Sequence, residues 1–280
     1  MMIYPFRIVN VFAESPLSGN PLCVFEHSEG LSTETMQALA LQFNLAETSF
    51  ILPSSLATAK IRIFTPAFEM PFAGHPTLGS AHVIRDLMQT GDQLSIETLA
   101  GIIPVSAQRN DWTLQARTPQ WKAAKLSSDE LAAMLGIAPP DLGGEALWMN
   151  TGSAQLLIPL VSRHAVEKCK PDNTLLGKLA RNPEGEALVY VWDASASETV
   201  RARFFYLKGD VLAEDYGTGS ACANLGGWFI ATQHSLPLHR EIIQIQPSQR
   251  ASKLTLRVEA SGAIHGTGKV HALGRGEIEL

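Results

Sequence analysis

The chain has 280 residues, of which 22 are Lys or Arg and 27 are Asp or Glu, so its formal charge is −5. This length predicts one large domain or two domains of roughly 140 residues each. A mildly acidic chain without a run of Lys and Arg is not expected to bind nucleic acid. No apolar stretch approaches the roughly 20 residues that cross a bilayer. The charged fraction of 18% is below the roughly 25% of average soluble domains, which favours much surface turned inward or toward a partner chain.

The three cysteines, Cys23, Cys169 and Cys222, are odd in number and far apart, which argues against a disulfide framework. The first dozen residues lack the charged segment and long apolar core of a signal peptide. We therefore expect a cytoplasmic protein.

Strands and two helices are predicted in the first part of the chain. Ser32 predicts the start of a helix that runs to about Phe43. The segment 71–77 leads into a second helix over 78–89, with Pro76 marking its first helical position. This helix carries apolar or small residues on nearly every side, so we expect it to be buried. Strands are predicted at 2–12, 22–25, 48–52, 60–64, 94–98, 102–107 and 112–116.

The second part of the chain repeats this pattern. Ser127 and Glu130 form a capping-box signature that opens a short helix closed by Gly136. Residues 218–233 are rich in small and apolar side chains and predict another buried helix, again entered through a glycine loop. Strands are predicted at 147–150, 155–160, 187–192, 200–206, 241–246, 253–259 and 263–273.

Glycine loops occur at matching places in the two parts. Gly19 and Gly152 each precede an apolar strand, and Gly74 and Gly217 each precede a buried helix. We infer an α+β fold of two pseudo-symmetric halves, with the last strand able to pack back on the first half. The close spacing of the strands predicts mostly antiparallel sheet. The predicted halves are residues 1–119 and 120–280.

The start of each buried helix is a candidate binding site. Free N–H groups and the positive end of the helix dipole favour anions or a developing oxyanion, and helix ends from two facing halves would meet in one cleft. The candidate residues there are His75, Asp215, Thr218 and Ser220. Each also has an ordinary interpretation: His75 and Ser220 as local helix caps, and Asp215 as half of a solvated acid pair with Glu214.

Glu47 is the strongest candidate for acid–base chemistry. It stands where a predicted helix passes to a strand, among the apolar residues of 45–52. A carboxylate in an apolar setting has its pKa raised toward neutrality, which suits a general acid and base. The alternative is a strand residue that points to solvent, and Glu69 raises the same question more weakly.

Other chemistries have little support in the sequence. It has neither a GxxxxGK(S/T) loop nor a strand-linked GxGxxG. Cys23 and His27 give one possible metal pair that no second pair completes. Cys222 lies in the second buried helix, either as a nucleophile near a helix N-terminus or, more simply, as a small core residue.

Several short motifs occur together in a characteristic order. They are Val9-Asn10-Val11-Phe12, Gly19-Asn20-Pro21, Ala46-Glu47-Thr48-Ser49-Phe50, Phe64-Thr65-Pro66, Pro71-Phe72-Ala73-Gly74-His75-Pro76-Thr77, Glu214-Asp215 and Thr218-Gly219-Ser220-Ala221. With this set, which spans most of its length, the chain resembles the PhzF-like (phenazine biosynthesis-like) isomerases, which share the diaminopimelate epimerase fold.

The resemblance implies two pseudo-symmetric halves, each a curved, barrel-like sheet around a central helix, with the active site between them. It also implies an enzyme that needs no cofactor and often forms a homodimer, and no metal is expected. In the phenazine member of the family a glutamate, matching Glu47, moves a proton between carbons of trans-2,3-dihydro-3-hydroxyanthranilate. The other catalytic positions match His75, Asp215 and Ser220. The loop residues expected to bind substrate are Gly74, Tyr216, Thr218 and Gly219.

Three positions distinguish the chain from related enzymes. Amino-acid epimerases of this fold use two facing cysteines at the starts of the glycine loops, where this sequence has Ala73 and Tyr216, so a two-thiol racemase is disfavoured. Tyr216 also replaces the small residue or proline usual in the family, and Asn10 stands where an aspartate is common. Tyr216 favours a different, smaller substrate.

The leading hypothesis is a cofactor-independent isomerase that moves a proton between carbons of a small anionic metabolite, cyclic or derived from an amino acid. Glu47 would be its acid and base. The second hypothesis is an epimerase or dehydratase that uses Glu47 with His75. The third is a metabolite-binding protein without turnover, against which the four retained polar residues argue.

Overall fold

The computed structural model describes residues 2–195, 198–245 and 250–280. Backbone contacts group the chain into two units: unit 1 is Met1–Gln115 with Thr267–Leu280, and unit 2 is Ala116–Gly266. The predicted division into functional halves at residue 119 stays a prediction. No helix in the described part of the chain is both long enough and apolar enough to span a membrane.

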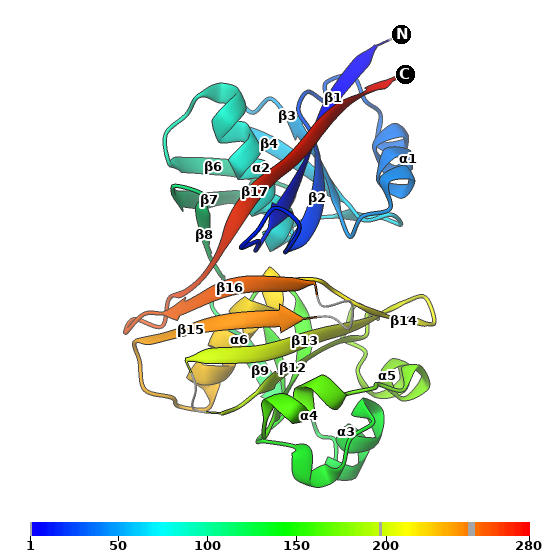
Figure 1. Cartoon of the computed structure of the whole chain (residues 1–280), viewed down its shortest axis with the longest axis vertical. Helices are drawn as coiled ribbons and strands as arrows, with labels where there is room; N and C mark the ends of the chain where they lie inside the picture. Colours follow the sequence, from blue (N-terminus) through cyan, green and yellow to red (C-terminus); the bar gives the residue numbers. More distant parts are fainter. Residues whose placement is uncertain (1, 196–197, 246–249) are drawn as a thin grey trace. The chain divides into compact units, whose positions relative to one another are not determined.

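Eight strands of unit 1 close into a barrel. The pairs β2–β3 and β4–β6 are parallel, whereas β1–β2, β3–β4, β6–β7 and β7–β8 are antiparallel. β17 completes the circle by pairing with β8 and, antiparallel, with β1, so the two ends of the chain lie side by side (Figure 1). The barrel strands are β1 (Ile3–Val11), β2 (Asn20–Phe25), β3 (Thr48–Leu52), β4 (Ala59–Phe64), β6 (Gln93–Thr98), β7 (Gly101–Gln108), β8 (Asp111–Gln115) and β17 (Ile264–Glu279). The short β5 (Glu69–Met70) pairs with β4.

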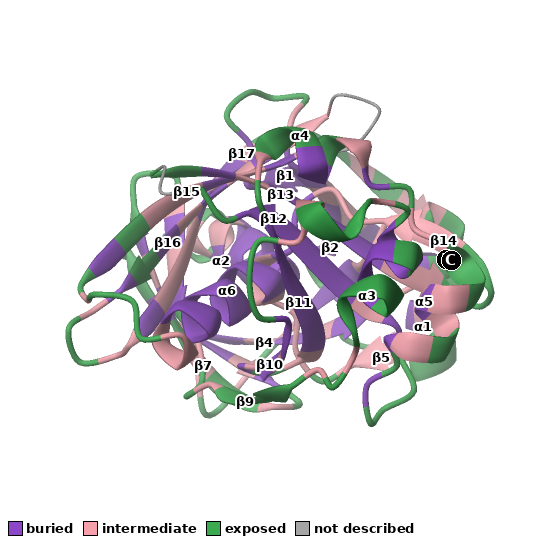
Figure 2. Cartoon of the chain, turned by 90° about the horizontal axis from the view of Figure 1, so that it is seen from below, coloured by how far each residue is buried: buried purple, intermediate pink, exposed green. Residues whose placement is uncertain are grey.

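Helix α2 (Gly74–Met88) contacts strands around this barrel, and its first half is almost entirely buried (Figure 2). Small residues allow the fit, since a Cβ added at Gly79 would lie 2.6 Å from a methyl carbon of Leu22. The helix begins four residues before the predicted start, and Pro76 is its third residue rather than its first. Proline is tolerated there because the first-turn N–H groups have no partner within the helix.

Helix α1 (Thr33–Phe43) packs on the outer face of the sheet of unit 1, against β3 and β4. The predicted cap is confirmed, because the Ser32 side chain accepts a hydrogen bond from the Thr35 N–H. Asn44 ends the helix in the left-handed conformation and turns the chain toward β3. The apolar cluster beneath α1 comprises Tyr4, Cys23, Phe25, Met36, Leu39, Ala40, Phe50 and Phe64.

Unit 2 repeats the strand pattern of unit 1. The pairs β11–β12 and β13–β15 are parallel, and β9–β10, β10–β11, β12–β13, β13–β14 and β15–β16 are antiparallel. Residue 246, the predicted end of one strand, lies outside the described residues. The strands are β9 (Gln120–Ala123), β10 (Leu147–Asn150), β11 (Ala154–Leu160), β12 (Leu188–Asp193), β13 (Thr199–Lys208), β14 (Val211–Glu214), β15 (Leu238–Ile245) and β16 (Ala251–Val258).

The helices of unit 2 include one buried helix, α6 (Gly219–Ala231), which packs against β9, β10, β11 and β16. The capping box of Ser127 and Glu130 is present at α3 (Ser128–Leu135), and Gly136 ends that helix, as predicted. No pattern in the sequence predicted α4 (Arg163–Lys168), α5 (Asn173–Leu179), the 3₁₀ turn Pro139–Asp141 or β9. The first two helices lie in the crossover between the parallel strands β11 and β12.

The predicted α+β repeat is confirmed by this shared topology. Helix α2 follows β5 and α6 follows β14, and each is followed by the next strand of a parallel pair. The two helices begin at different points relative to these glycines, since α2 begins at Gly74 after Ala73 whereas α6 begins at Gly219 after Thr218. The loop of unit 2 has two glycines and its helix starts at the second. The residue-by-residue matching of the two loops, Gly74 with Gly217, stays a prediction.

Candidate functional site

Glu47 and His75 are paired in unit 1. Glu47 lies in the loop between α1 and β3, and His75 is the second residue of α2. Oε2 of Glu47 is 3.0 Å from Nδ1 of His75, with 18% of the glutamate side chain exposed against 5% of the histidine. The glutamate therefore contacts a buried histidine and remains partly exposed, unlike a strand residue pointing freely to solvent. His75 is not the helix cap, since that position belongs to Ala73.

The second nitrogen of His75 determines how many protons this pair holds. Nε2 lies 3.3 Å from the carbonyl oxygen of Pro21, which can only accept a hydrogen bond, so Nε2 carries a proton. One further proton then lies between Nδ1 and Glu47. The pair is either an imidazolium beside a carboxylate or a neutral imidazole beside a carboxylic acid.

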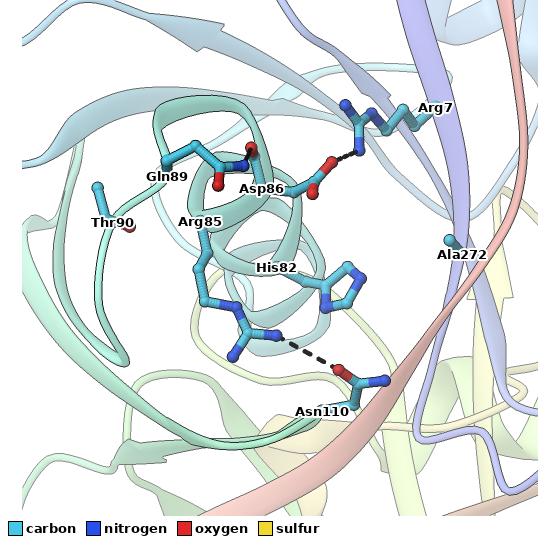
Figure 3. Close-up of a pocket in the computed structure, with 8 residues that line it drawn as sticks. All are labelled: Arg7, His82, Arg85, Asp86, Gln89, Thr90, Asn110 and Ala272. Carbon is cyan, nitrogen blue, oxygen red and sulfur yellow. Dashed lines mark hydrogen bonds and ion pairs between the residues drawn. The ribbon is translucent and has the colours of Figure 1, made fainter.

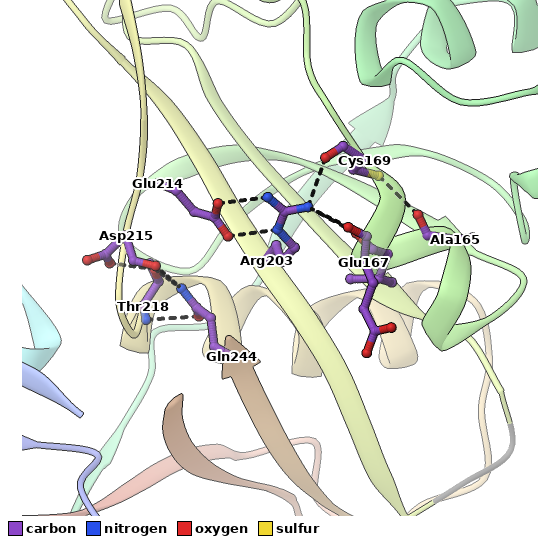
Figure 4. A network of polar contacts seen from close by, with 9 residues as sticks. Ala165, Glu167, Cys169, Arg203, Glu214, Asp215, Thr218 and Gln244 are labelled. Atoms are coloured by element: carbon purple, nitrogen blue, oxygen red, sulfur yellow. Dashed lines mark hydrogen bonds and ion pairs between the residues drawn. The ribbon is translucent and has the colours of Figure 1, made fainter. Parts of the chain in front are cut away.

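Asp215 in unit 2 is held by the loop that enters α6. Its Oδ1 accepts from the Tyr216 N–H at 2.8 Å, and its Oδ2 accepts from the Thr218 hydroxyl at 2.6 Å. The buried side chain of Gln244 holds this loop, donating to the Asp215 carbonyl and to the Thr218 hydroxyl while accepting from the Thr218 N–H (Figure 4). The Thr218 hydroxyl proton is therefore already used by Asp215.

Glu214 does not form a solvated acid pair with Asp215. It makes a two-point ion pair with Arg203, at 2.8 Å for both contacts, and both side chains are nearly buried (Figure 4). The other terminal nitrogen of Arg203 donates to the carbonyls of Val166, Glu167 and Cys169. Glu214 therefore fixes the strand that leads into the Asp215 loop.

Ser220 is the second residue of α6, the position that His75 occupies in α2. Its hydroxyl oxygen accepts a hydrogen bond of 2.8 Å from the Gln155 amide. The two glycines predicted to bind substrate, Gly74 and Gly219, are the first residues of their helices. Tyr216 stands in the same loop as Asp215, with the guanidinium carbon of Arg250 5.3 Å from its ring centroid.

Three functional candidates were missed from the sequence: Gln155, Asn224 and Gln244. All three are buried amide side chains that contact the start of α6 or its supporting strands. A signal was available, because Gln155 begins an otherwise apolar strand and Asn224 interrupts a helix of small and apolar residues. Buried polar groups of this kind need specific partners.

The minor candidates have structural roles. Glu69 accepts two hydrogen bonds of 2.6 and 2.7 Å from Arg62, so its role is accounted for by this ion pair without a part in catalysis. Burial raises the pKa of the Cys222 thiol to about 12, so Cys222 is a core residue rather than a nucleophile. Burial also raises the pKa of Cys23, the cysteine of the possible metal pair. Within the described ranges, no group of three His, Cys, Asp or Glu side chains is placed to share a metal ion.

A separate cavity of about 480 Å³ lies at the C-terminal end of α2 (Figure 3). Its arginines are engaged by carboxylates: Arg7 with Asp86 and Glu26, and Arg85 with Asp92. His82, a partly buried residue in this cavity, accepts a hydrogen bond of 3.4 Å from the Trp112 ring N–H. None of the residues predicted for catalysis lines the cavity. The cavity is lined by Arg7, His82, Arg85, Asp86, Gln89, Thr90, Asn110 and Ala272.

The fold is of the epimerase-like α+β class. A probable proline racemase from Agrobacterium radiobacter superposes with a TM-score of 0.66 at 11% identity, covering 99% of this chain and 93% of that one. A phenazine biosynthesis protein of the PhzF family from Bacillus anthracis superposes more closely, with a TM-score of 0.88 at 24% identity and full coverage of both chains.

Residues 9–276 match the family model described as phenazine biosynthesis-like protein, and the chain belongs to that family. An uncharacterized isomerase of Pasteurella multocida is 37% identical over 98% of this chain and 94% of its own length. The trans-2,3-dihydro-3-hydroxyanthranilate isomerase of Pseudomonas aeruginosa is 32% identical over 98% of this chain and 99% of its own length. The resemblance drawn from the sequence motifs is confirmed.

Proposed function

We propose that the protein is a cofactor-independent isomerase that moves a proton between two carbons of a small anionic metabolite, with Glu47 as the acid and base. The observation that carries the proposal is the 3.0 Å contact between Glu47 and His75 at the start of a buried helix. A partly exposed carboxylate that shares a proton with a buried histidine suits a residue that must act first as base and then as acid. The names of the relatives, isomerases at 37% and 32% identity, support the same reaction class.

The reaction needs no net change in atoms or electrons. The Glu47 carboxylate takes a proton from a weakly acidic C–H bond, and the electron pair left behind spreads over the conjugated system of the substrate. The resulting carboxylic acid, whose proton exchanges with water, then gives a proton to another carbon of that system. His75, whose Nδ1 faces Glu47, steadies the carboxylate before the transfer and the carboxylic acid after it.

The second set of residues serves the same reaction by binding polar groups of the substrate. The start of α6 favours negative charge, and hydrogen-bond donors placed where such charge develops stabilise a transition state. Asp215, an acceptor when ionised, suits an amino or hydroxyl group. A substrate with both kinds of group, such as trans-2,3-dihydro-3-hydroxyanthranilate or a smaller analogue that fits beside Tyr216, matches this set. The Pseudomonas aeruginosa relative is named for that compound.

We also propose a cytoplasmic homodimer. The support is the low charged fraction of 18%, which is expected of a chain with a covered surface. Light scattering after size-exclusion chromatography would give twice the chain mass, and a mass of one chain would contradict the proposal.

Deuterium uptake tests the proposed reaction. The protein, without added cofactor, is incubated in D₂O with trans-2,3-dihydro-3-hydroxyanthranilate and a panel of cyclic and amino-acid-derived carboxylates. Product formation with carbon-bound deuterium, located by NMR and absent with Glu47→Gln, is the expected result. The labelled position also separates an isomerase from an epimerase, since only the former moves the double bond. Turnover that survives in Glu47→Gln would overturn the proposal.

A further inference from the structure

Three buried side chains form a chain of hydrogen bonds that ends at Ser220. Asn224 and Gln155 are 0% and 1% exposed, and Thr151 is also buried. Asn224 Oδ1 accepts from both the N–H and the hydroxyl of Thr151, at 2.8 Å each. Asn224 Nδ2 donates to the Ser153 carbonyl and to Gln155 Oε1, at 2.9 Å each. Gln155 Nε2 then donates to the Ser220 hydroxyl oxygen at 2.8 Å.

Backbone groups fix the direction of every bond in this series. The Thr151 N–H can only donate, so the atom of Asn224 that faces it is the amide oxygen. The Ser153 carbonyl can only accept, so the atom that faces it is the amide nitrogen. Both contacts give Asn224 the same orientation. Gln155 must then present its oxygen to Asn224 and its NH₂ to Ser220.

The orientation of Gln155 decides what Ser220 can do. An amide NH₂ only donates, so the Ser220 oxygen is held as an acceptor and its own proton points elsewhere. Ser220 is only partly buried, and among the described residues Gln155 is the one group found hydrogen-bonded to its side chain. Thr218, two residues earlier, differs because its proton is given to Asp215.

We propose that Gln155 and Asn224 are positioning residues that fix the Ser220 hydroxyl as a hydrogen-bond donor to an anionic or carbonyl oxygen of the bound substrate. The inference rests on the proposed function, because it assigns Ser220 its role toward the same substrate. It narrows that role to recognition of an acceptor, such as a carboxylate or the oxygen of a developing enolate. Gln155 occupies one of the two lone pairs of the Ser220 oxygen. A substrate group that only donates, such as an amine, could therefore use only the second lone pair.

Replacing the amide nitrogen of Gln155 with oxygen should reverse the direction of its hydrogen bond with Ser220. In Gln155→Glu the side chain keeps its length, but its carboxylate only accepts, so the Ser220 proton turns toward residue 155 and is lost to the substrate. A hydrogen bond to a charged group is worth about 1.5–3 kcal/mol, which corresponds to a loss of about 10- to 100-fold in kcat/KM. Ser220→Ala should cause a loss of the same size with trans-2,3-dihydro-3-hydroxyanthranilate as the probe.

The double variant distinguishes positioning from a general packing effect. If Gln155 acts through Ser220, adding Gln155→Glu to Ser220→Ala lowers kcat/KM by less than about threefold more. If the double variant instead showed the product of the two single-variant losses in kcat/KM, the proposal would be overturned. Gln244→Glu is a matched control, because Gln244 of β15 is equally buried but contacts Asp215 and Thr218 in the loop before α6. The fold loss in kcat/KM caused by Gln244→Glu should multiply with the fold loss caused by Ser220→Ala when the two substitutions are combined.

Neutron diffraction from a crystal exchanged into D₂O reads the same geometry without any substrate or variant. The expected map shows a deuteron on the Ser220 oxygen that points away from Gln155, with two deuterons on the Gln155 nitrogen. A Ser220 deuteron on the line to Gln155 would overturn the inference. This readout holds even if wild-type protein turns over no compound in the panel, which would count against the proposed function alone.

Discussion

Nδ1 of His75 lies 3.0 Å from Oε2 of Glu47, while Nε2 of the same ring faces the Pro21 carbonyl. The contact depends on three elements of unit 1: the first turn of α2, the start of β2 and the loop that leads from α1 to β3. Because β2 and β3 are parallel neighbours, Pro21 and Glu47 lie at the same end of adjacent strands. The strands of unit 1 therefore place His75, whose Nε2 proton faces Pro21, against the Glu47 carboxylate at the start of α2.

Replacing Glu47 with Gln should remove turnover and leave the fold in place. Gln has the same shape but cannot take up and return a proton, so kcat should fall by the roughly 100- to 10,000-fold typical of a general acid–base residue. Glu69→Gln is the matched control, since Glu69 belongs to the same unit and is paired with Arg62. It should retain wild-type kcat. Equal losses in both variants, or a large fall in the urea midpoint of Glu47→Gln, would mean that Glu47 acts through stability.

All three thiols should be inert in the native protein. Cys23, Cys169 and Cys222 are buried, and burial raises the pKa of both Cys169 and Cys222 to about 12. Ellman's reagent at pH 8 should therefore modify none of them quickly in buffer and all three in denaturant. Cys222→Ala should keep its turnover. Rapid modification of one thiol together with loss of activity would contradict this prediction and would indicate a mechanism that uses that thiol.

Much of the fold was predictable because local signals agreed with the global arrangement. The cap at Ser32, the capping box at Ser127 and the apolar character of α2 each specify an element without reference to distant parts of the chain. The helices α4 and α5 lack such signals, being short and only partly apolar. The repeat itself would have indicated them, because a parallel pair needs a crossover and α1 fills the equivalent place in unit 1.

The candidate site was predictable in its residue types but not in its connections. Glu47, His75, Asp215 and Ser220 stand in motifs, so they could be named from the sequence, whereas their roles stay predictions. The proton state of His75 depends on a carbonyl of another strand, and the orientation of Ser220 depends on a backbone N–H at Thr151. Such long-range hydrogen bonds leave no periodicity in the sequence.

The Arg203–Glu214 pair should make a large contribution to the stability of unit 2. Removing one partner of a nearly buried ion pair leaves the other charge without compensation, so Glu214→Gln should lower the free energy of unfolding by about 3 kcal/mol. Glu167→Gln breaks an exposed pair with Arg163 and should cost less than about 1 kcal/mol. Urea titrations followed by tryptophan fluorescence measure both. Equal midpoints for the two variants would show that the buried pair is not an anchor.

His82 should make the protein less stable as the pH falls from about 6.5 toward 4. Burial, aided by repulsion from Arg85, lowers the pKa of His82 from 6.5 to about 4, so the unfolded chain binds this proton at a higher pH than the folded chain does. The contribution is fully present above about pH 6.5, decreases as the pH falls, and amounts to about 3 kcal/mol at most. Protonation would also end the acceptor role of Nδ1 toward the Trp112 ring N–H.

The test compares urea midpoints of the wild-type protein and His82→Gln between pH 7.5 and 4. Carboxylates with a lowered pKa, such as Asp86 beside Arg7, weaken both proteins on acidification, so the difference between the two curves isolates His82. Wild-type stability should fall more steeply, and His82→Gln should follow a shallower line. The exposed residue His239 supplies the control, since His239→Gln should leave the wild-type slope unchanged. Parallel curves for wild-type and His82→Gln would show that His82 takes up its proton equally in the folded and unfolded states.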